Sequence, residues 1–170
     1  MLEKLTYKYC VSGYYNQESG IMDIKDYQNA IEYSRLFKAC EFISASTINL
    51  KGANLEDAIL QAFNFEDANL KGAKLYGAYL YDANLHSANL TGANLIDANL
   101  EDANLTGANL EDANLEDANL EGANLEEANL TNANLKNANL TDANISDAIL
   151  VGANLSGASI TIGSGVYKLA

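Results

Sequence analysis

The sequence predicts an all-β solenoid assembled from five-residue units, and three observations carry this prediction. The tripeptide Ala-Asn-Leu recurs at five-residue spacing between residues 53–55 and 153–155. Large and small apolar residues alternate within each unit, and residues that favour tight turns follow each leucine by two positions. Neither an amphipathic helix nor a continuous strand has a period of five. Each unit must therefore combine a short extended piece with a turn.

The apolar positions of the unit predict a dry interior. If the recurring leucine is taken as the centre of a unit, 23 units run from Leu50 to Ile160, and 20 of the centres are Leu. Two residues before the centre, 21 of 23 positions are Ala, the exceptions being Ile48 and Phe63. Large and small side chains that alternate in this way can interlock. The two bulky exceptions predict a wider first coil or a contact with the N-terminal segment.

The polar positions of the unit predict corners and hydrogen bonds. Gly, Asp or Asn fills 19 of the 23 positions that lie two residues after the centre, and these residues tolerate a left-handed backbone. Asn precedes the centre in 18 units. We expect its amide to bond the neighbouring backbone or the matching Asn one coil along.

The repeated A-N-L-x-[GDN] pattern resembles the pentapeptide-repeat family, whose consensus is A-[DN]-L-x-x. The resemblance implies a right-handed quadrilateral β-helix with four pentapeptides in each coil. On that geometry the 23 units form slightly under six coils. A solenoid of this kind needs neighbouring coils to stack, and it needs its ends covered.

The chain divides into three expected segments. Residues 1–44 are predicted to form a small α-containing N-terminal cap, residues 45–162 the β-helix, and residues 163–170 a C-terminal cap or tail. Alternating apolar residues favour a strand within residues 2–11, with a helix as the alternative, and residues 13–20 read as a loop. Asp23 can begin a helix that runs to about Cys40. The N-terminal segment either covers the first coil or forms a separate module for binding a partner.

Composition narrows the classes of partner and compartment. The formal net charge of −13 disfavours binding to nucleic acid or to an anionic membrane, and it suits a basic partner. Cys10 and Cys40 are the two cysteines, so no disulfide framework is implied, and a reducing cytoplasm fits. The first residues contain no apolar stretch typical of a signal peptide, and no run is long enough to span a membrane. We therefore expect a cytoplasmic protein.

A tyrosine cluster interrupts the polar outer positions of the repeat. Tyr76, Tyr79 and Tyr81 lie near Lys74 and His86 in the sequence, and the family geometry implies that these aromatic side chains face outward. Tyrosine is enriched at protein interfaces because it combines apolar area with a polar tip. The cluster is either a recognition patch or an ordinary surface ladder between coils.

Acidic residues follow the tyrosines. Ten lie between Asp97 and Glu127, and no Lys or Arg occurs from residue 75 to residue 135. With four units per coil they form an acidic belt, and one face is also acidic at a spacing of about twenty residues. Such a surface is either simply solvated or binds a partner, and paired carboxylates also serve Ca²⁺ binding and acid–base chemistry. The candidate interaction residues are Tyr76, Tyr79, Tyr81, Asp82, Glu101, Asp102, Glu121 and Asp142.

The sequence contains no pattern that predicts catalysis. His86 is the sole histidine, it forms no zinc-type spacing with Cys10 or Cys40, and the glycines fit neither a P-loop nor a dinucleotide-binding motif. We expect no catalytic residues, no cofactor and no metal site.

Two functions from different classes follow. The first is a non-catalytic interaction or scaffold protein with an unknown partner, expected to be a basic or DNA-binding protein rather than nucleic acid or a membrane. The second is implied by the resemblance: an acidic DNA mimic that binds a type II topoisomerase and inhibits gyrase or protects it from quinolones. A purely structural or stress role is a third alternative. Ile149 and Val151 break the polar outer pattern, so we expect a monomer or a weak homodimer.

Overall fold

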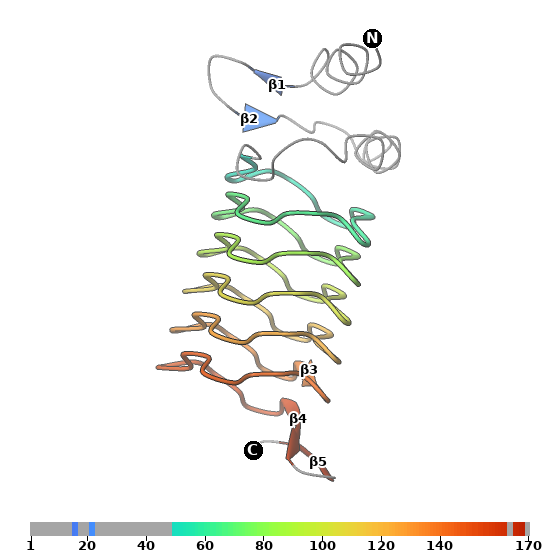
Figure 1. Cartoon of the computed structure of the whole chain (residues 1–170), viewed down its shortest axis with the longest axis vertical. Helices are drawn as coiled ribbons and strands as arrows, with labels where there is room; N and C mark the ends of the chain where they lie inside the picture. Colours follow the sequence, from blue (N-terminus) through green and yellow to red (C-terminus); the bar gives the residue numbers. More distant parts are fainter. Residues whose placement is uncertain (1–14, 17–20, 23–48, 163–164, 169–170) are drawn as a thin grey trace.

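The computed structural model describes residues 15–16, 21–22, 49–162 and 165–168, and residues 49–162 form a rod of stacked coils (Figure 1). Parallel bridges join residues that are twenty apart, from the pair Asn49 and Asn69 to the pair Asn134 and Asn154. Four five-residue units therefore complete one coil, which has four sides. We number the sides by their first centres: Leu50, Leu55, Leu60 and Phe65. The predicted total of slightly under six coils remains a prediction.

Regular strands are short because every five-residue unit contains a two-residue turn. β1 (Tyr15–Asn16) pairs antiparallel with β2 (Ile21–Met22). β3 (Asn139–Leu140) pairs in parallel with β4 (Ser159–Ile162), which pairs antiparallel with β5 (Gly165–Lys168). Along the rest of the rod each unit contributes a single bridged residue, the one before its centre. The predicted unit of one short extended piece and one turn is confirmed.

The corners of the coil depend on left-handed backbone. Every residue two positions after a centre, from Gly52 to Gly157, has a positive φ between 54° and 74°. This confirms the role expected for the Gly, Asp and Asn residues at that position. Ala62, Ser87 and Glu127 adopt the same conformation, although an L-residue with an ordinary side chain disfavours it.

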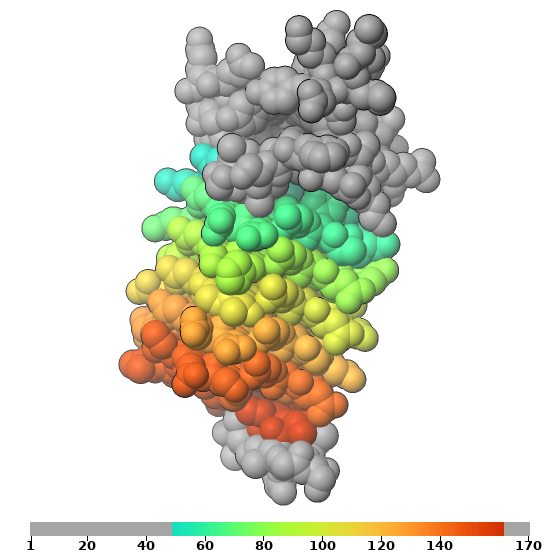
Figure 2. All heavy atoms as spheres, in the orientation of Figure 1, coloured from blue at the N-terminus to red at the C-terminus, as the bar shows by residue number. Residues whose placement is uncertain are grey.

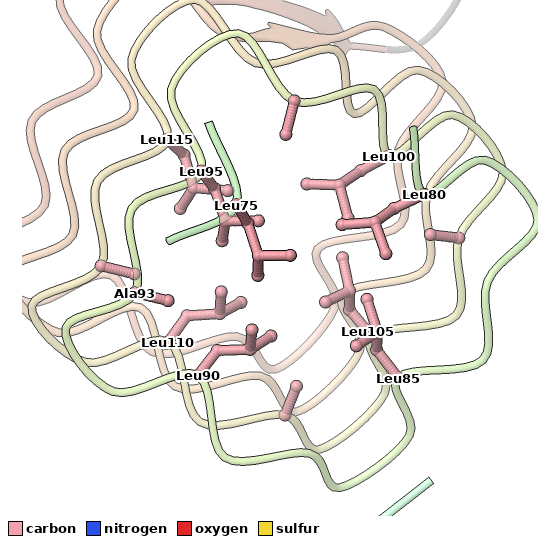
Figure 3. Close-up of a cluster of buried hydrophobic side chains, with 14 of the residues drawn as sticks. Leu75, Leu80, Leu85, Leu90, Ala93, Leu95, Leu100, Leu105, Leu110 and Leu115 are labelled. Atoms are coloured by element: carbon pink, nitrogen blue, oxygen red, sulfur yellow. The ribbon is translucent and has the colours of Figure 1, made fainter. Parts of the chain in front are cut away.

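The interior of the rod is filled by the leucines and alanines of the repeat. Figure 3 shows leucines from all four sides pointing inward, with Leu75, Leu95 and Leu115 stacked one coil apart on the second side. The centres from Leu50 to Leu140 are buried. Removing each leucine side chain from water contributes about 1.5–3 kcal/mol before conformational entropy is subtracted. Successive coils remain in contact along the rod in the space-filling view (Figure 2).

Phe63, which replaces an interior Ala, is accommodated by a neighbouring ring. It is buried and stacks on Phe65, with 5.3 Å between the ring centroids. The second bulky exception, Ile48, lies outside the described residues.

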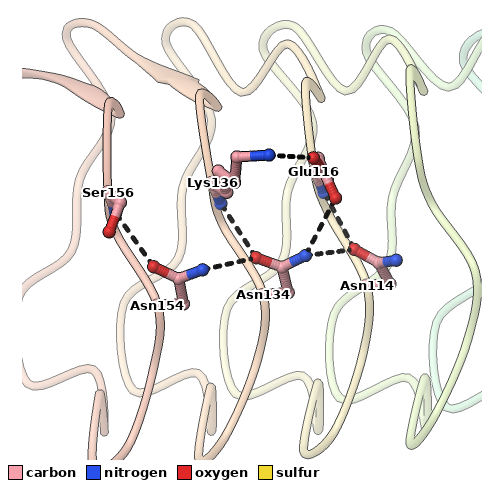
Figure 4. A network of polar contacts seen from close by, with 6 residues as sticks. All are labelled: Asn114, Glu116, Asn134, Lys136, Asn154 and Ser156. Atoms are coloured by element: carbon pink, nitrogen blue, oxygen red, sulfur yellow. Dashed lines mark hydrogen bonds and ion pairs between the residues drawn. The ribbon is translucent and has the colours of Figure 1, made fainter.

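Asparagine ladders run along the outside of the coils, as Figure 4 shows for Asn114, Asn134 and Asn154. The Oδ1 atom of Asn134 accepts a hydrogen bond from the backbone N–H of Lys136 at 3.2 Å. Its Nδ2 atom donates to Oδ1 of Asn114, one coil earlier, at 2.9 Å. Both kinds of bond expected for these amides are therefore present.

The two ends of the chain are described only in part. The helix expected from Asp23, the strand or helix expected within residues 2–11, and residues 163–164 and 169–170 of the expected C-terminal cap or tail lie outside the described residues. The expectation of a loop throughout residues 13–20 is wrong at Tyr15 and Asn16, because these residues pair with β2. In the described part of the chain, no helix has the length and apolar character needed to cross a lipid bilayer.

The apolar core is less well covered at its last coil. Ile145, Leu150, Leu155 and Ile160 are only partly buried, although they occupy the same positions as the buried centres before them. On the outer surface of this coil, Ile149 is 48% exposed and Val151 is 69% exposed.

Candidate functional site

The third side of the rod brings two of the tyrosines, Tyr79 and Tyr81, and several acidic residues onto one continuous surface. On each side the residues before and after a centre flank an inward-pointing leucine, so both face outward. On the third side, successive coils therefore present Ile59 and Gln61, Tyr79 and Tyr81, Asn99 and Glu101, Asn119 and Glu121, and Asn139 and Thr141. We call this surface, with the acidic residues at its adjoining corner, the tyrosine–acid face.

Tyr79 and Tyr81 are neighbours on this face. They flank the buried Leu80, and their side chains are 50% and 36% exposed. Bridges place Tyr79 between Ile59 of the preceding coil and Asn99 of the following coil. The pair thus forms an exposed aromatic area that borders the first acidic residues.

Tyr76 belongs to a different side from the other two tyrosines. It flanks Leu75, which enters the core from the second side, whereas Leu80 enters from the third (Figure 3). Its side chain is 43% exposed. A hydrogen bond to the Asp97 carboxylate, together with the negative charge of that group, raises the pKa of the Tyr76 hydroxyl. The structure therefore separates the predicted cluster into a pair and a single residue.

The acidic candidates fall into two adjacent rows. Asp82, Asp102 and Asp142 occupy the corner that follows the third side, where each has a positive φ. Glu121 does not share that corner: it lies on the side itself, in the same row as Glu101, and the corner position of its coil is Gly122. The carboxylate of Asp102 reaches over Gly122.

Hydrogen bonds from the following coil orient the two glutamates of the tyrosine–acid face. Asn119 Nδ2 donates to Glu101 Oε2 at 3.4 Å, and Asn139 Nδ2 donates to Glu121 Oε2 at 3.1 Å. Asp142, at the end of the row, is bound differently, since its Oδ1 accepts a hydrogen bond from the Thr161 hydroxyl at 3.1 Å. The carboxylates are thus held by neutral groups.

One ion pair occurs among the described residues, and it lies on the second side. Lys136 Nζ is 2.7 Å from Glu116 Oε1, while Asn134 Nδ2 donates to Glu116 Oε2 (Figure 4). The hydrogen bond with Lys136 and the positive charge of its ammonium lower the pKa of Glu116, and the same pairing raises the pKa of Lys136. The acidic residues of the tyrosine–acid face have no such cation among the described residues.

No group of three or more His, Cys, Asp or Glu residues in the described part of the chain is placed to hold a metal ion. His86 flanks Leu85 on the fourth side, separate from the tyrosine–acid face, and Cys10 and Cys40 lie outside the described residues.

Three contributors to this face were missed by sequence reasoning. Ile59 extends its apolar end, and Asn119 and Asn139 orient its glutamates. The signal that would have found them is the twenty-residue spacing: Ile59 and Tyr79 are twenty residues apart, as are Asn119 and Asn139.

Comparison with known proteins connects this geometry to a family. The model of the family described as pentapeptide repeats matches residues 48–86, 83–122 and 118–157. The comparison with curated proteins finds no match.

Solved structures of pentapeptide repeat proteins are similar to this chain. One from the thylakoid lumen of Arabidopsis thaliana has 31% identity over 62% of this chain and 79% of its own, with a TM-score of 0.46. HetL, from the cyanobacterium Nostoc and involved in heterocyst differentiation regulation, has 36% identity over 65% of this chain and 60% of its own, with a TM-score of 0.38. QnrB1, a plasmid-mediated fluoroquinolone resistance protein, has 15% identity over 66% of this chain and 65% of its own, with a TM-score of 0.40. The chain spans less than two thirds of the length of HetL and of QnrB1.

Proposed function

Because this chain belongs to the pentapeptide repeat family, whose fold is the right-handed quadrilateral β-helix, we propose that it is a non-catalytic scaffold that binds a protein partner through its tyrosine–acid face. The single observation that carries the proposal is the exposed pair Tyr79 and Tyr81 beside acidic residues that lack a cation among the described residues. Tyrosine supplies contact area at little entropic expense, and unpaired carboxylates attract a basic partner.

The rigidity of the coil supports the same proposal. Backbone hydrogen bonds of 2.6 to 3.3 Å link the described coils and close their turns, and the asparagine ladders add a second set. A surface held in this way loses little freedom on binding, which favours affinity.

Affinity capture with matched variants tests this function. Immobilised wild-type protein, Tyr79→Ala/Tyr81→Ala and Tyr76→Ala are each exposed to lysate of the source organism, and retained proteins are identified by mass spectrometry. We expect one partner to be retained by the wild type and by Tyr76→Ala and to be lost with the double variant. Retention of the same proteins by all three, or an intrinsic turnover activity of the purified chain, contradicts the proposal.

The charge density of the rod favours a second candidate, an acidic DNA mimic that binds a type II topoisomerase. Residues 49–162 contain 17 acidic residues and 4 lysines. Duplex DNA has about one negative charge per 1.7 Å of axis, so a rod of roughly 28 Å corresponds to about 16 charges. The arrangement fits less well, because the acids from Glu101 to Glu127 encircle the rod rather than follow grooves.

A gyrase supercoiling assay with and without a fluoroquinolone decides on this second candidate. DNA mimicry requires inhibition or drug protection at low micromolar protein, weakened by salt and abolished by reversing the charges of Glu101, Asp102, Glu121 and Asp142. An absence of any effect at saturating protein, or an effect that survives charge reversal, rules it out.

We also propose a cytoplasmic location and, at high concentration, a weak homodimer through the exposed Ile149 and Val151. Sedimentation velocity over a range of concentrations tests the dimer. Association should disappear in Ile149→Asp/Val151→Asp, and association that persists in this variant places the contact elsewhere.

A further inference from the structure

Glu116 provides an internal example of how a glutamate of this rod binds a cation. Its Oε2 accepts a hydrogen bond from Asn134 of the next coil at 3.3 Å, and its Oε1 pairs with the ammonium of Lys136 at 2.7 Å. The two partners are two residues apart on the same side of the next coil. An asparagine and a cation together therefore give each oxygen of the Glu116 carboxylate one partner.

Glu101 and Glu121 reproduce the first half of this arrangement and lack the second. Each accepts from the next coil's asparagine through Oε2, as Glu116 does. Lys136 lies twenty residues after Glu116. At the same spacing, Glu101 is followed by Glu121 and Glu121 is followed by Thr141, and neither of these following residues is a cation. Among the described residues, neither Glu101 nor Glu121 has a cationic partner. A partner molecule can supply the missing cation to carboxylates that are already oriented.

The tyrosine pair adds a different preference to the same face. Arg is better suited than Lys to stack on an exposed aromatic ring, and its planar guanidinium bridges two carboxylates. Neither Lys nor Arg of this chain occupies an outer position of the third side from Ile59 to Thr141. The tyrosine pair and the two glutamates therefore both favour arginine.

The spacing of the coils indicates how far apart two arginines of a partner would lie if one contacted the tyrosines and the other the glutamates. Residues twenty apart lie about 4.8 Å apart along the rod, so the midpoint between Glu101 and Glu121 is roughly 7 Å from Tyr81. In an extended peptide, alternate residues face the same way and are about 6.8 Å apart. Two arginines separated by one residue thus match the distance from the tyrosines to the glutamates.

We propose that the tyrosine–acid face binds an extended Arg-x-Arg segment of a protein partner, with one guanidinium on Tyr79 and Tyr81 and the other between Glu101 and Glu121. This inference rests on the proposed scaffold function and names the chemistry of its partner. The segment lies along the rod axis, across the strands, and its charge complements the unpaired acids of the face.

Fluorescence anisotropy with two labelled, end-blocked probe peptides, Gly-Arg-Ser-Arg-Gly and Gly-Lys-Ser-Lys-Gly, tests the inference on the full chain. We expect the wild type to bind the arginine probe roughly two- to fivefold more tightly than the lysine probe. Tyr79→Leu/Tyr81→Leu should remove this preference, and Tyr79→Phe/Tyr81→Phe should keep it. A preference that is absent in the wild type, or that survives the leucine variant, overturns the proposal, as does a failure of both probes to bind.

A charge-matched control separates this face from the overall charge of the chain. Glu101→Gln/Glu121→Gln should weaken both probes at least about fivefold, whereas Glu56→Gln/Glu111→Gln, which changes the charge equally on the second and first sides, should weaken them less than about twofold. Equal weakening by the two double variants overturns the site. Thermal unfolding followed by circular dichroism verifies that each variant folds.

The capture experiment distinguishes failure of this inference from failure of the scaffold function. If the probes do not bind but Tyr79→Ala/Tyr81→Ala still loses a partner, the function stands and the Arg-x-Arg chemistry is wrong. If capture does not depend on the tyrosines, the scaffold function on this face fails whatever the probes do.

Discussion

At the scale of single residues, the corner position decides how well each unit tolerates substitution. The described corners from Gly52 to Gly157 are left-handed, which glycine adopts freely and other L-residues adopt at a cost of about 1–2 kcal/mol. The space around each corner adds a second factor. A Cβ at Gly92 would meet nothing within 4 Å, whereas one at Gly122 would meet the Asp102 carboxylate.

Alanine substitutions at these two glycines separate backbone strain from steric conflict. Gly92→Ala should lower the free energy of unfolding by about 1 kcal/mol, because only the left-handed φ opposes it. Gly122→Ala should lower it further, since the Asp102 side chain must also move. Urea unfolding measures both values. Equal losses of unfolding free energy would mean that the Asp102 side chain moves aside without an energetic cost.

Glu127 is a corner at which a substitution should stabilise the rod. Its φ of 58° suits asparagine, which tolerates left-handed backbone better than glutamate does. Glu127→Asn should raise the free energy of unfolding by about 0.5 kcal/mol. Because the change also removes a negative charge, Glu111→Asn, which lies outside the corners, is the control. A gain of the same size in the control would assign the effect to charge alone.

Among single residues, those that repeat in every unit could be predicted from the sequence, and the placement of the tyrosines was not. Leu centres, interior alanines, left-handed corners and both asparagine bonds were predicted from the five-residue pattern, because each depends on contacts that repeat in every unit. The division of the tyrosines was not, because Tyr76 and Tyr79 differ by only three residues yet flank leucines on different sides. The five-residue register already assigns Tyr76 to the unit of Leu75 and Tyr79 to the unit of Leu80, so treating the tyrosines as one cluster by their closeness in sequence overlooked it.

At the scale of the element, the asparagine ladder joins one coil to the next. Asn134 donates to Asn114 and to Glu116, and its Oδ1 accepts from the Nδ2 of Asn154 at 3.1 Å. Asn94 accepts a hydrogen bond from the backbone of Ile96, but it has Lys74 as its neighbour in the preceding coil. Asn134 therefore takes part in both the ladder and a turn, whereas Asn94 serves mainly in a turn.

Comparison of Asn134→Ala with Asn94→Ala isolates the ladder. Both variants lose the bond within the turn, and only the first interrupts a run of side-chain amides. We expect Asn134→Ala to cost about 1 kcal/mol more than Asn94→Ala, the usual net value of a partly exposed hydrogen bond. Thermal and urea unfolding measure the difference. Indistinguishable losses would show that water replaces the ladder fully.

The N-terminal segment illustrates the limit of pattern reading at this scale. Apolar residues alternate over only a few positions within residues 2–11, so the pattern favours a strand there and leaves a helix as the alternative. β1 then formed where a loop was expected, because backbone pairing between Tyr15–Asn16 and Ile21–Met22 produces no apolar periodicity over so few residues. The role of this segment as a cap stays a prediction.

At the scale of the whole molecule, the core is tight along the rod and loosens in its last coil. Leu100 is 0% exposed, with a coil on either side, whereas Leu150 is only partly buried. Because each coil of a solenoid packs mainly on its neighbours, the cost of a lost side chain depends on where its coil lies. Ile149 and Val151 are apolar residues at outward-facing positions of the same coil, which makes them the candidates for self-association.

Leucine truncation should reveal this gradient. Leu100→Ala is expected to lower the free energy of unfolding by about 3–5 kcal/mol, because it leaves a cavity between two packed coils. Leu150→Ala should cost less than half as much, since its site is partly exposed and can relax. The result is read from urea unfolding, and similar losses at the two positions would indicate that the last coil is covered in solution.

The twenty-residue coil has a consequence for how such a gene can change length. Duplication of twenty codons inserts one complete coil, which lengthens the rod and returns every later residue to its own side. Duplication or loss of five codons leaves the corners and core intact, yet it turns everything downstream by a quarter of a revolution. A slip of one pentapeptide between Tyr81 and Glu101 would preserve the fold while moving the acidic residues away from the tyrosines. Replication errors in the repeat can therefore change which residues share a binding surface while the protein keeps its fold.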